Sequence, residues 1–208
     1  MNMQETKEIS PYKQGLRYKI IETAMKAFAA NGIRLVKMDD IASELTISKR
    51  TLYEIFDKKE DLLYEGVKTY LGERRNQMEI RAGQCSNVME IILQTYKLKV
   101  DEYRHTNPRF YTDLVKYPKV ARYLTHQNEQ MRSNMTHFIQ RGISEGFFRE
   151  DVNPELAAQP FDAMGKHVME KKLFYRYSIE DIFKNLIFGS LRGICTTKGI
   201  EAIDQWKK

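Results

Sequence analysis

The stretch MDDIASELTISKRTLYEIF, residues 38–56, contains the pattern that decides the fold of this chain. Its apolar residues recur at helical spacing in two groups, which are Met38, Ile41, Ala42 and Leu45, and then Leu52, Ile55 and Phe56. This spacing predicts two short helices that each bury one face and are joined by a tight turn. Such a pair has the layout of a helix-turn-helix, whose second helix enters the major groove of DNA.

The second helix is basic and aromatic on the side that faces away from its apolar residues. Lys49 and Arg50 offer cations that bind phosphates, and Arg also pairs with guanine. Tyr53 offers a hydroxyl that donates to a phosphate oxygen. Ser48 precedes the helix and is a good N-cap, because its hydroxyl accepts from a free backbone N–H. A solvated charged face on an ordinary helical hairpin explains the same spacing, so the flanking sequence has to decide.

The segments on both sides of the hairpin supply further helices. An apolar stripe between Leu16 and Phe28 predicts a helix before it, and Asn31-Gly32 ends that helix because Gly accepts the left-handed conformation. After the hairpin, Asp57 is expected to cap a connecting helix that runs from Lys59 to about residue 78. These helices bury a small shared core of about 60 residues, a size that is marginal alone.

The run GIRLVKMDDIASELTISKRTLYEIFDKKEDLL, residues 32–63, resembles the N-terminal DNA-binding head of the tetracycline-repressor (TetR) family of bacterial regulators. The residues that fall at the family's typical positions without a gap are Ser48, Thr51, Leu52, Tyr53, Phe56, Lys59, Glu60 and Leu62. The resemblance implies an all-α protein with a three-helix head. It also implies a larger helical body, about nine helices in all, that binds an effector and forms a homodimer.

Three positions depart from the family's usual pattern. Lys37 stands where a small hydroxyl residue commonly caps the first helix of the motif, and a lysine cannot cap. Thr46 stands where the turn glycine is common, so it must take an unusual backbone conformation or the turn must differ. Arg50 stands at a common glycine position and is expected to add a contact. The expected DNA-binding residues are Lys37, Ser48, Lys49, Arg50, Thr51, Tyr53 and Lys59.

Length and composition agree with one small and one medium domain. The chain has 208 residues and is 42% apolar, which is enough for a core. We expect a flexible tail over 1–12, the helix-turn-helix domain over 13–60, the connecting helix and join over 61–86, and the body over 87–208. The net charge of +6 favours a polyanionic partner. Residues 1–60 hold 11 Lys and Arg against 9 Asp and Glu, so the excess is not concentrated in the head.

Several classes of protein are disfavoured. An apolar run near 18 residues and a signal peptide are both absent, so we expect a cytoplasmic protein without a membrane partner. The two cysteines, Cys85 and Cys195, give neither a disulfide framework nor metal-ligand spacing. Phosphate-binding glycine loops, nucleophile elbows and HExxH motifs are also missing, so we expect no enzyme, no metal and no cofactor.

The body has a helical pattern from residue 87 onward. The predicted helices cover about 88–104, a short segment around 110–115, about 119–145, 154–174 and about 178–197. Aromatic residues and methionines in them fill a core or line an effector pocket with equal ease. The resemblance favours a pocket for a small organic effector, whose candidate residues are Tyr96, Tyr103, Phe110, Tyr111, Met131, Met135, Phe138, Phe161, Met164 and His167.

The last two predicted helices are apolar over a broad surface. This surface is core in a monomer or an interface in a dimer. In the family, the last two helices of each subunit make a four-helix interface, which here comprises Phe161, Ile182, Phe183, Leu186, Ile187, Ser190, Leu191 and Ile194. A two-fold dimer suits DNA, because two recognition helices about 34–36 Å apart read successive major grooves of a palindrome.

We therefore expect a homodimeric transcriptional regulator that binds a palindromic operator in double-stranded DNA. The resemblance favours a repressor that a small-molecule effector releases from DNA. Two alternatives stay open, a family member that acts as an activator and a helical protein-interaction module without DNA binding. The basic, aromatic face from Lys49 to Tyr53 separates the regulator from the interaction module, which has no need of it.

Overall fold

The computed structural model describes residues 11–206, except for the side chains of residues 128–133 and of Asp162. Regular structure within these residues is helical, apart from one isolated antiparallel bridge between Phe148 and Cys195. The helices are α1 (Pro11–Asn31), α2 (Met38–Glu44), α3 (Lys49–Ile55), α4 (Lys59–Gln84), α5 (Val88–His105), α6 (Pro108–Leu114), α7 (Pro118–Ser144), α8 (Pro154–Glu170), α9 (Ile179–Ile182), α10 (Phe188–Arg192) and α11 (Thr197–Gln205). The all-α prediction is confirmed.

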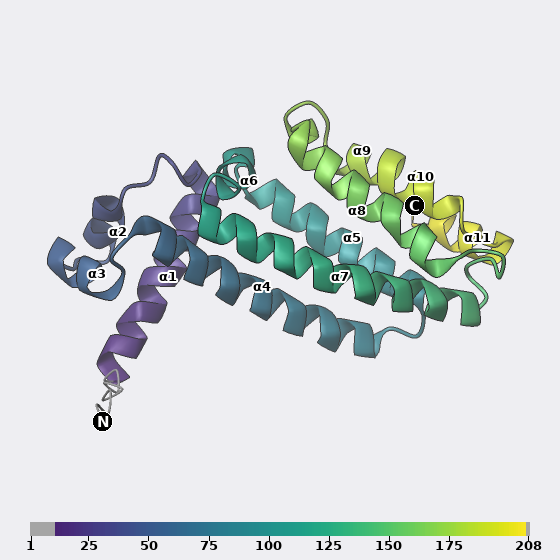
Figure 1. Cartoon of the computed structure of the whole chain (residues 1–208), viewed down its shortest axis with the longest axis horizontal. Helices are drawn as coiled ribbons and strands as arrows, with labels where there is room; N and C mark the ends of the chain where they lie inside the picture. Colours follow the sequence, from purple (N-terminus) through teal and green to yellow (C-terminus); the bar gives the residue numbers. More distant parts are fainter. Residues whose placement is uncertain (1–10, 207–208) are drawn as a thin grey trace, which may run out of the picture.

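The N-terminal head consists of α1, α2, α3 and the first turns of α4 (Figure 1). Its fully buried side chains include Ile20, Phe28, Ile41, Leu52 and Leu62. α1 ends at Asn31, and Gly32 follows with φ of +84°. A Cβ on Gly32 would lie 2.8 Å from the Cβ of Arg109, so both the turn and the close approach require glycine. α1 begins at Pro11, and residues 1–10 of the predicted tail lie outside the described residues.

The helix starts in the head follow the sequence with one exception. The Ser48 hydroxyl accepts from the Thr51 N–H at 3.0 Å, so the predicted cap of α3 is confirmed. Lys37 gives α2 no side-chain cap, and instead the Asp40 carboxylate accepts from the Lys37 backbone N–H at 2.8 Å. The expectation that Asp57 caps the connecting helix is wrong. The chain is still extended at Lys58, which is the N-cap residue of α4, so Asp57 lies one residue too early.

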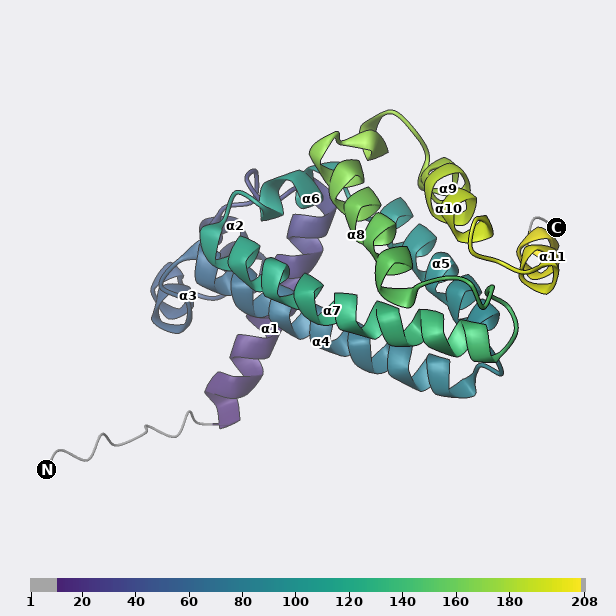
Figure 2. The same cartoon turned by 45° about the vertical axis from the view of Figure 1, so that its right-hand side comes forward.

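The body is built from long helices that run beside one another. α7 packs against both α4 and α8, and Figures 1 and 2 show α8, α9 and α10 on the side of the body away from α4. A second core lies toward the C-terminal end, and its buried residues are Val88, Met89, Ile139, Phe147, Phe148, Ala158, Leu191, Cys195 and Ile203. α4 spans 26 residues, about 39 Å, and thus joins the head to this far end.

The predicted helix boundaries agree with α5, α6 and α7. They differ from the structure for the connecting helix α4 and for the helices after α7. α4 continues to Gln84, beyond the predicted residue 78. α8 ends at Glu170 and is followed by a 3-10 turn over Leu173–Tyr175. The predicted helix over 178–197 is α9, a π-helical segment (Phe183–Ile187) and α10 in succession, and it ends at Arg192. α11 was not predicted.

The head and body share one continuous core through α6. Phe110, Leu114 and Val120 are buried in the same cluster as the side chains of the head. Hydrogen bonds also cross the same contact. The Asn107 N–H donates to the Ala29 carbonyl at 2.7 Å, and the Arg34 N–H donates to the Asp113 carboxylate at 2.9 Å. The head therefore rests on α6 and not only on the connecting helix.

Candidate nucleic-acid interface

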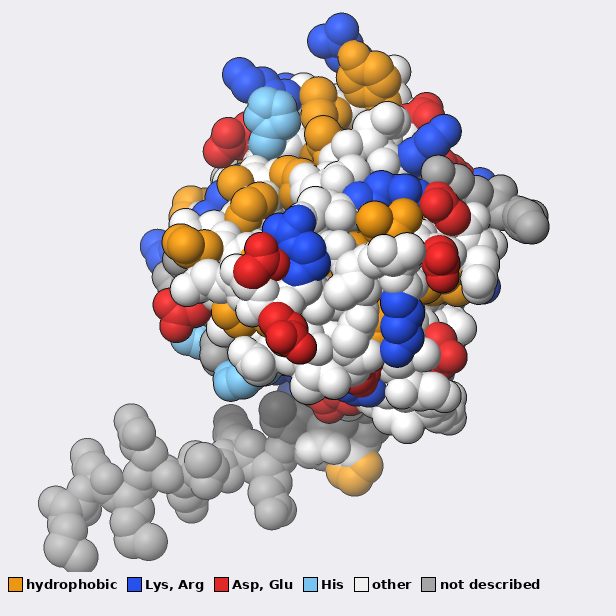
Figure 3. Space-filling view, turned by 90° about the vertical axis from the view of Figure 1, so that its right-hand side faces the viewer, with side chains coloured by type: hydrophobic (Ala, Val, Ile, Leu, Met, Phe, Trp, Pro, Cys, Tyr) orange, Lys and Arg blue, Asp and Glu red, His pale blue; other side chains and the backbone are white. Residues whose placement is uncertain are grey.

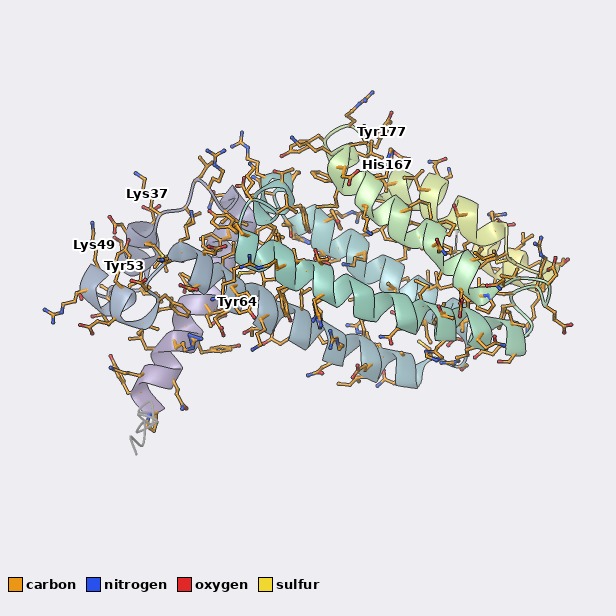
Figure 4. All side chains as sticks on the ribbon, viewed as in Figure 1. Lys37, Lys49, Tyr53, Tyr64, His167 and Tyr177 are labelled. Carbon is orange, nitrogen blue, oxygen red and sulfur yellow. The ribbon has the colours of Figure 1, made fainter. Side chains whose placement is uncertain are left out.

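α3 presents its polar face to solvent because its apolar face is held in the core. Leu52 is fully buried and Phe56 nearly so, which fixes the rotation of the helix. Lys49 and Arg50 are exposed on the other side, and Tyr53 is 47% exposed. Figure 4 shows Lys49 and Tyr53 at the end of the molecule formed by the head, with Lys37 nearby. The structure thus brings three of the predicted DNA-binding residues to one end of the molecule.

The two cations of α3 are paired with carboxylates. Lys49 forms an ion pair with Asp39 on α2, and this hydrogen bond raises the pKa of the lysine. Arg50 pairs with Glu54 one turn further along α3, at 2.9 Å. Exposed ion pairs contribute little to stability and exchange readily. Both cations are therefore able to leave their carboxylates for phosphate oxygens.

Ser48 and Thr51 form the start of α3. Their hydroxyl oxygens lie 2.7 Å apart, and the Ser48 oxygen also accepts from the Thr51 N–H. These bonds hold the first turn of α3 in place. Both residues lie next to the exposed cations, where the N-terminal end of the helix favours an anion.

Lys59 is placed differently from the prediction. Its ammonium group turns into the head and donates to the carbonyls of Ile33 and Val36, over the ring of Phe28. Burial lowers the pKa of Lys59, and the charges of Asp113 and Asp40 oppose the shift. The side chain fixes the loop between α1 and α2. Two of its three ammonium donors are used in this way, so the structure gives Lys59 a positioning role, and its direct DNA contact stays a prediction.

The predicted effector-pocket residues are spread over three places. Tyr103 stacks on Tyr111 with ring centroids 4.5 Å apart, next to Phe110, near the head. Tyr96 packs instead against Phe183 and Phe188. Met135, Phe138 and Phe161 contact the second core, Met164 accepts from the Ser190 hydroxyl at 3.4 Å, and His167 is exposed (Figure 4). The side chain of Met131 lies outside the described residues.

The predicted set is not gathered in either of two clefts on the described surface. One, of about 600 Å³, lies between the C-terminal part of α4 and the start of α5, and its lining includes Gln77, Arg81 and Leu93. The other, of about 280 Å³, lies between α1, α4, α5 and α6 and includes Phe110 and Tyr111. The predicted residues Phe110 and Tyr111 line the second cleft, but the sequence had no signal for the part that α1 supplies, since α1 and α6 are far apart in the chain.

The predicted dimer face is partly core. Ile182 and Leu191 are buried within the protomer, so they are corrected from interface to core residues. The remaining predicted residues, Phe161, Phe183, Leu186, Ile187, Ser190 and Ile194, are partly exposed. α8 adds Leu156, which is 66% exposed and was not predicted. Seen from the far end of the body, apolar side chains form small groups separated by charged ones (Figure 3).

Metal sites and membrane spans are two further kinds of feature to consider among the described residues. Groups of three or more His, Cys, Asp or Glu side chains that could hold a metal ion do not occur there. Helices long and apolar enough to cross a membrane do not occur there either.

An exposed, basic second helix on a helix-turn-helix head, carried by a helical body, defines a DNA-binding protein. Residues 20–65 match the model of the family described as bacterial regulatory proteins, tetR family. The chain is 27% identical over 150 residues to the HTH-type transcriptional repressor KstR2 of Rhodococcus jostii, covering 70% of this chain and 74% of that protein.

Solved structures share the fold. A putative transcriptional regulator from Saccharomonospora viridis in complex with choline superposes with a TM-score of 0.73 at 20% identity, over 88% of this chain and 99% of that one. The ketosteroid transcriptional regulator KstR2 of Mycobacterium tuberculosis gives 0.58 at 22% identity, over 91% and 97%. Residues 20–65 are therefore a TetR-family DNA-binding domain, and the chain is a DNA-binding transcriptional regulator, not an enzyme.

Proposed function

We propose that the protein is a homodimeric repressor that binds a palindromic operator and leaves it when a small organic molecule binds the body. The observation that carries the proposal is the exposed face of α3, where Lys49, Arg50 and Tyr53 project from a helix fixed by Leu52 and Phe56. KstR2 of Rhodococcus jostii, a repressor by name, supports repression over activation.

The position of each residue gives it a different role in the proposed DNA contact. Lys37, Lys49, Arg50 and Tyr53 meet phosphates or base edges, and Ser48 and Thr51 place the start of α3 against the backbone. Lys59 acts through the loop that it holds. The proposed head extends from α1 to the first turns of α4, and the proposed body begins where α4 leaves the head core.

Release requires that the effector favours an arrangement of the heads that does not fit the operator. α4 starts in the head core and packs against α7 in the body, so a shift of body helices moves the head. The effector must bind the arrangement without DNA more tightly by roughly 1–3 kcal/mol or more. The transcriptional regulator from Saccharomonospora viridis, solved in complex with choline, supports a small organic effector.

The test is fluorescence anisotropy on duplex DNA from just upstream of the coding region, across a salt series. We expect Lys49→Ala to weaken binding about 3- to 10-fold and to reduce the salt slope by about one. We expect Tyr53→Phe to weaken it about 2- to 10-fold, through one lost hydrogen bond.

Tyr177→Phe is the matched control, because Tyr177 is 51% exposed and lies on the body, away from the head (Figure 4). It should bind DNA like the wild type. Wild-type binding by both head variants would contradict the docking of α3. Binding of wild type no tighter than to random DNA, here and in a selection from random duplexes, would favour the interaction module.

A further inference from the structure

The cleft between head and body is enclosed by elements that are far apart in sequence. α1 supplies Ile21, Met25 and Ala29, α4 supplies Tyr70, and Phe110 and Tyr111 come from α6. These side chains make the cleft mostly apolar, with a volume of about 280 Å³, near the lower end for small-molecule sites. At Gly66 the helices α1 and α4 nearly touch, since a Cβ there would lie 2.5 Å from the Met25 sulfur.

Most charged groups at the cleft already have partners. Glu22 pairs with Lys26 at 2.8 Å on α1. Glu102 pairs with Arg74 at 2.7 Å, and Arg74 also donates to the Tyr70 hydroxyl at 3.0 Å. A charged ligand that bound to these groups would have to displace one of the pairs, and it would also lose its own hydration. The cleft therefore favours a neutral molecule.

One polar group in the wall lacks a partner. Tyr111 is only 8% exposed, and its hydroxyl makes no hydrogen bond of ordinary geometry, although the Thr106 side chain lies near it. The ring cannot turn freely, because it stacks on Tyr103 and lies edge-on to Phe110. Burial raises the pKa of Tyr111 far above its ordinary value, and the nearby Thr106 side chain partly opposes the shift, so the phenol stays neutral and able to donate. A buried hydroxyl without a partner is uncommon in native proteins.

We propose that this cleft binds a neutral, mostly apolar organic molecule whose ketone or hydroxyl oxygen bonds to Tyr111. The site uses α1 of the head as well as helices of the body, whereas the predicted pocket contained residues of the body alone. A molecule in it would press α1 away from α4 and α6 and strain the bond from Asn107 to Ala29. The effect on the head rests on the proposed function. The binding of the molecule in the cleft does not depend on it.

The test is a titration with prodan, a neutral naphthalene ketone whose emission shifts to the blue in apolar surroundings. Wild type should give a saturable blue shift. Tyr111→Phe should weaken prodan binding about 3- to 10-fold, since it removes one hydrogen bond and keeps the ring. Thr69→Trp should abolish binding, because Thr69 lines the cleft and an indole fills it. Leu93→Trp, in the other cleft, is the control and should bind like the wild type.

A second measurement locates the probe. Trp206 is the single tryptophan of the chain and packs on Phe188, far from α1 in the sequence. In a Trp206→Phe background, Tyr18→Trp places an indole at the mouth of the cleft, and its excitation should transfer to bound prodan. Full binding by Thr69→Trp with an unchanged far-UV spectrum, or absence of this transfer, would overturn the site. Unchanged affinity of Tyr111→Phe would overturn the hydrogen bond.

The same titration separates the two proposals. A protein that binds prodan in this cleft but no DNA would contradict the proposed function and support the site. A protein that binds its operator but shows no saturable prodan binding would contradict the site and leave the proposed function standing.

Discussion

Thr46 lies at the tightest point of the head, in the turn between α2 and α3. Its φ is +55°, the left-handed conformation, which costs a β-branched residue more than most others. The turn is nevertheless held on both sides. The Thr46 N–H donates to the Ser43 carbonyl at 3.1 Å, and the Ile47 N–H donates to the Ala42 carbonyl at 3.0 Å. The sequence left two outcomes for Thr46, and the structure has the strained one.

We expect Thr46→Gly to raise the free energy of unfolding by about 0.5–1 kcal/mol. Glycine avoids the cost of about 1–2 kcal/mol that a side chain has in the left-handed conformation. Glycine also loses more backbone entropy on folding, which offsets part of this gain. Chemical denaturation followed by circular dichroism measures the change. Ser43→Gly is the control, because Ser43 is exposed with ordinary helical backbone, and it should destabilise the protein. A destabilised Thr46→Gly protein would show that the turn does not strain Thr46.

Lys59 shows where prediction at the residue scale stops. Its position in the motif is visible in the sequence, but the direction of its side chain depends on the carbonyls of Ile33 and Val36, some 25 residues earlier. Ser48 is the opposite case, because its partner Thr51 is three residues away. Contacts within one turn were predictable, and contacts that the tertiary fold creates were not.

At the scale of elements, α6 is the joint between head and body. Asp113 on α6 is almost fully buried and accepts from the Arg34 N–H of the head and, at 2.9 Å, from Lys116. Burial pushes the pKa of Asp113 up, but the hydrogen bonds from Lys116 and Arg34 outweigh burial and hold it below its ordinary 3.8. The carboxylate therefore stabilises the folded state above about pH 3.8, and this contribution is lost as pH falls through the lower folded pKa.

We expect Asp113→Ala to lower the free energy of unfolding by about 1–3 kcal/mol at pH 7, since it leaves a backbone N–H without its acceptor. The difference from wild type should shrink as pH falls below about 3.8, because the unfolded carboxylate takes up a proton there and the folded one follows at lower pH. Urea titrations at each pH measure it. Asp151→Ala, which removes an exposed ion pair with Arg149, should cost under about 0.5 kcal/mol. An equal loss at pH 7 and pH 3 would exclude a role for the charge.

In the C-terminal region, the spacing of apolar residues did not predict where the helices end. The apolar pattern continues past Arg192, so one long helix was predicted. The helix ends there because backbone groups of residues 194–196 form hydrogen bonds with segment 147–149 instead of continuing the helix. The Arg149 N–H donates to the Ile194 carbonyl, and the Thr196 N–H donates to the Phe147 carbonyl, both at 2.9 Å. Thr196 then caps α11, a local signal that the sequence did contain and that was missed.

At the scale of the whole molecule, the two cores leave one side of the body without a covering layer. α8 and the run from α9 to α10 lie on that side (Figure 2), where Leu156 is 66% exposed and Leu186 and Ile187 are partly exposed. The far end of the body, by contrast, alternates charged and apolar groups (Figure 3). The proposed homodimer therefore uses the side formed by α8, α9 and α10.

We expect Leu156→Lys to shift the protein from dimer toward monomer in sedimentation velocity, because it places an ammonium group in an interface that must exclude water. Ile80→Lys is the matched control. Ile80 is 63% exposed on α4, across the body from α8 (Figure 1), and its replacement should leave the mass unchanged. DNA affinity should fall with the dimer in Leu156→Lys, since two heads bind one palindrome together. A dimer unchanged in Leu156→Lys but lost in Ile80→Lys would place the interface on the side of α4.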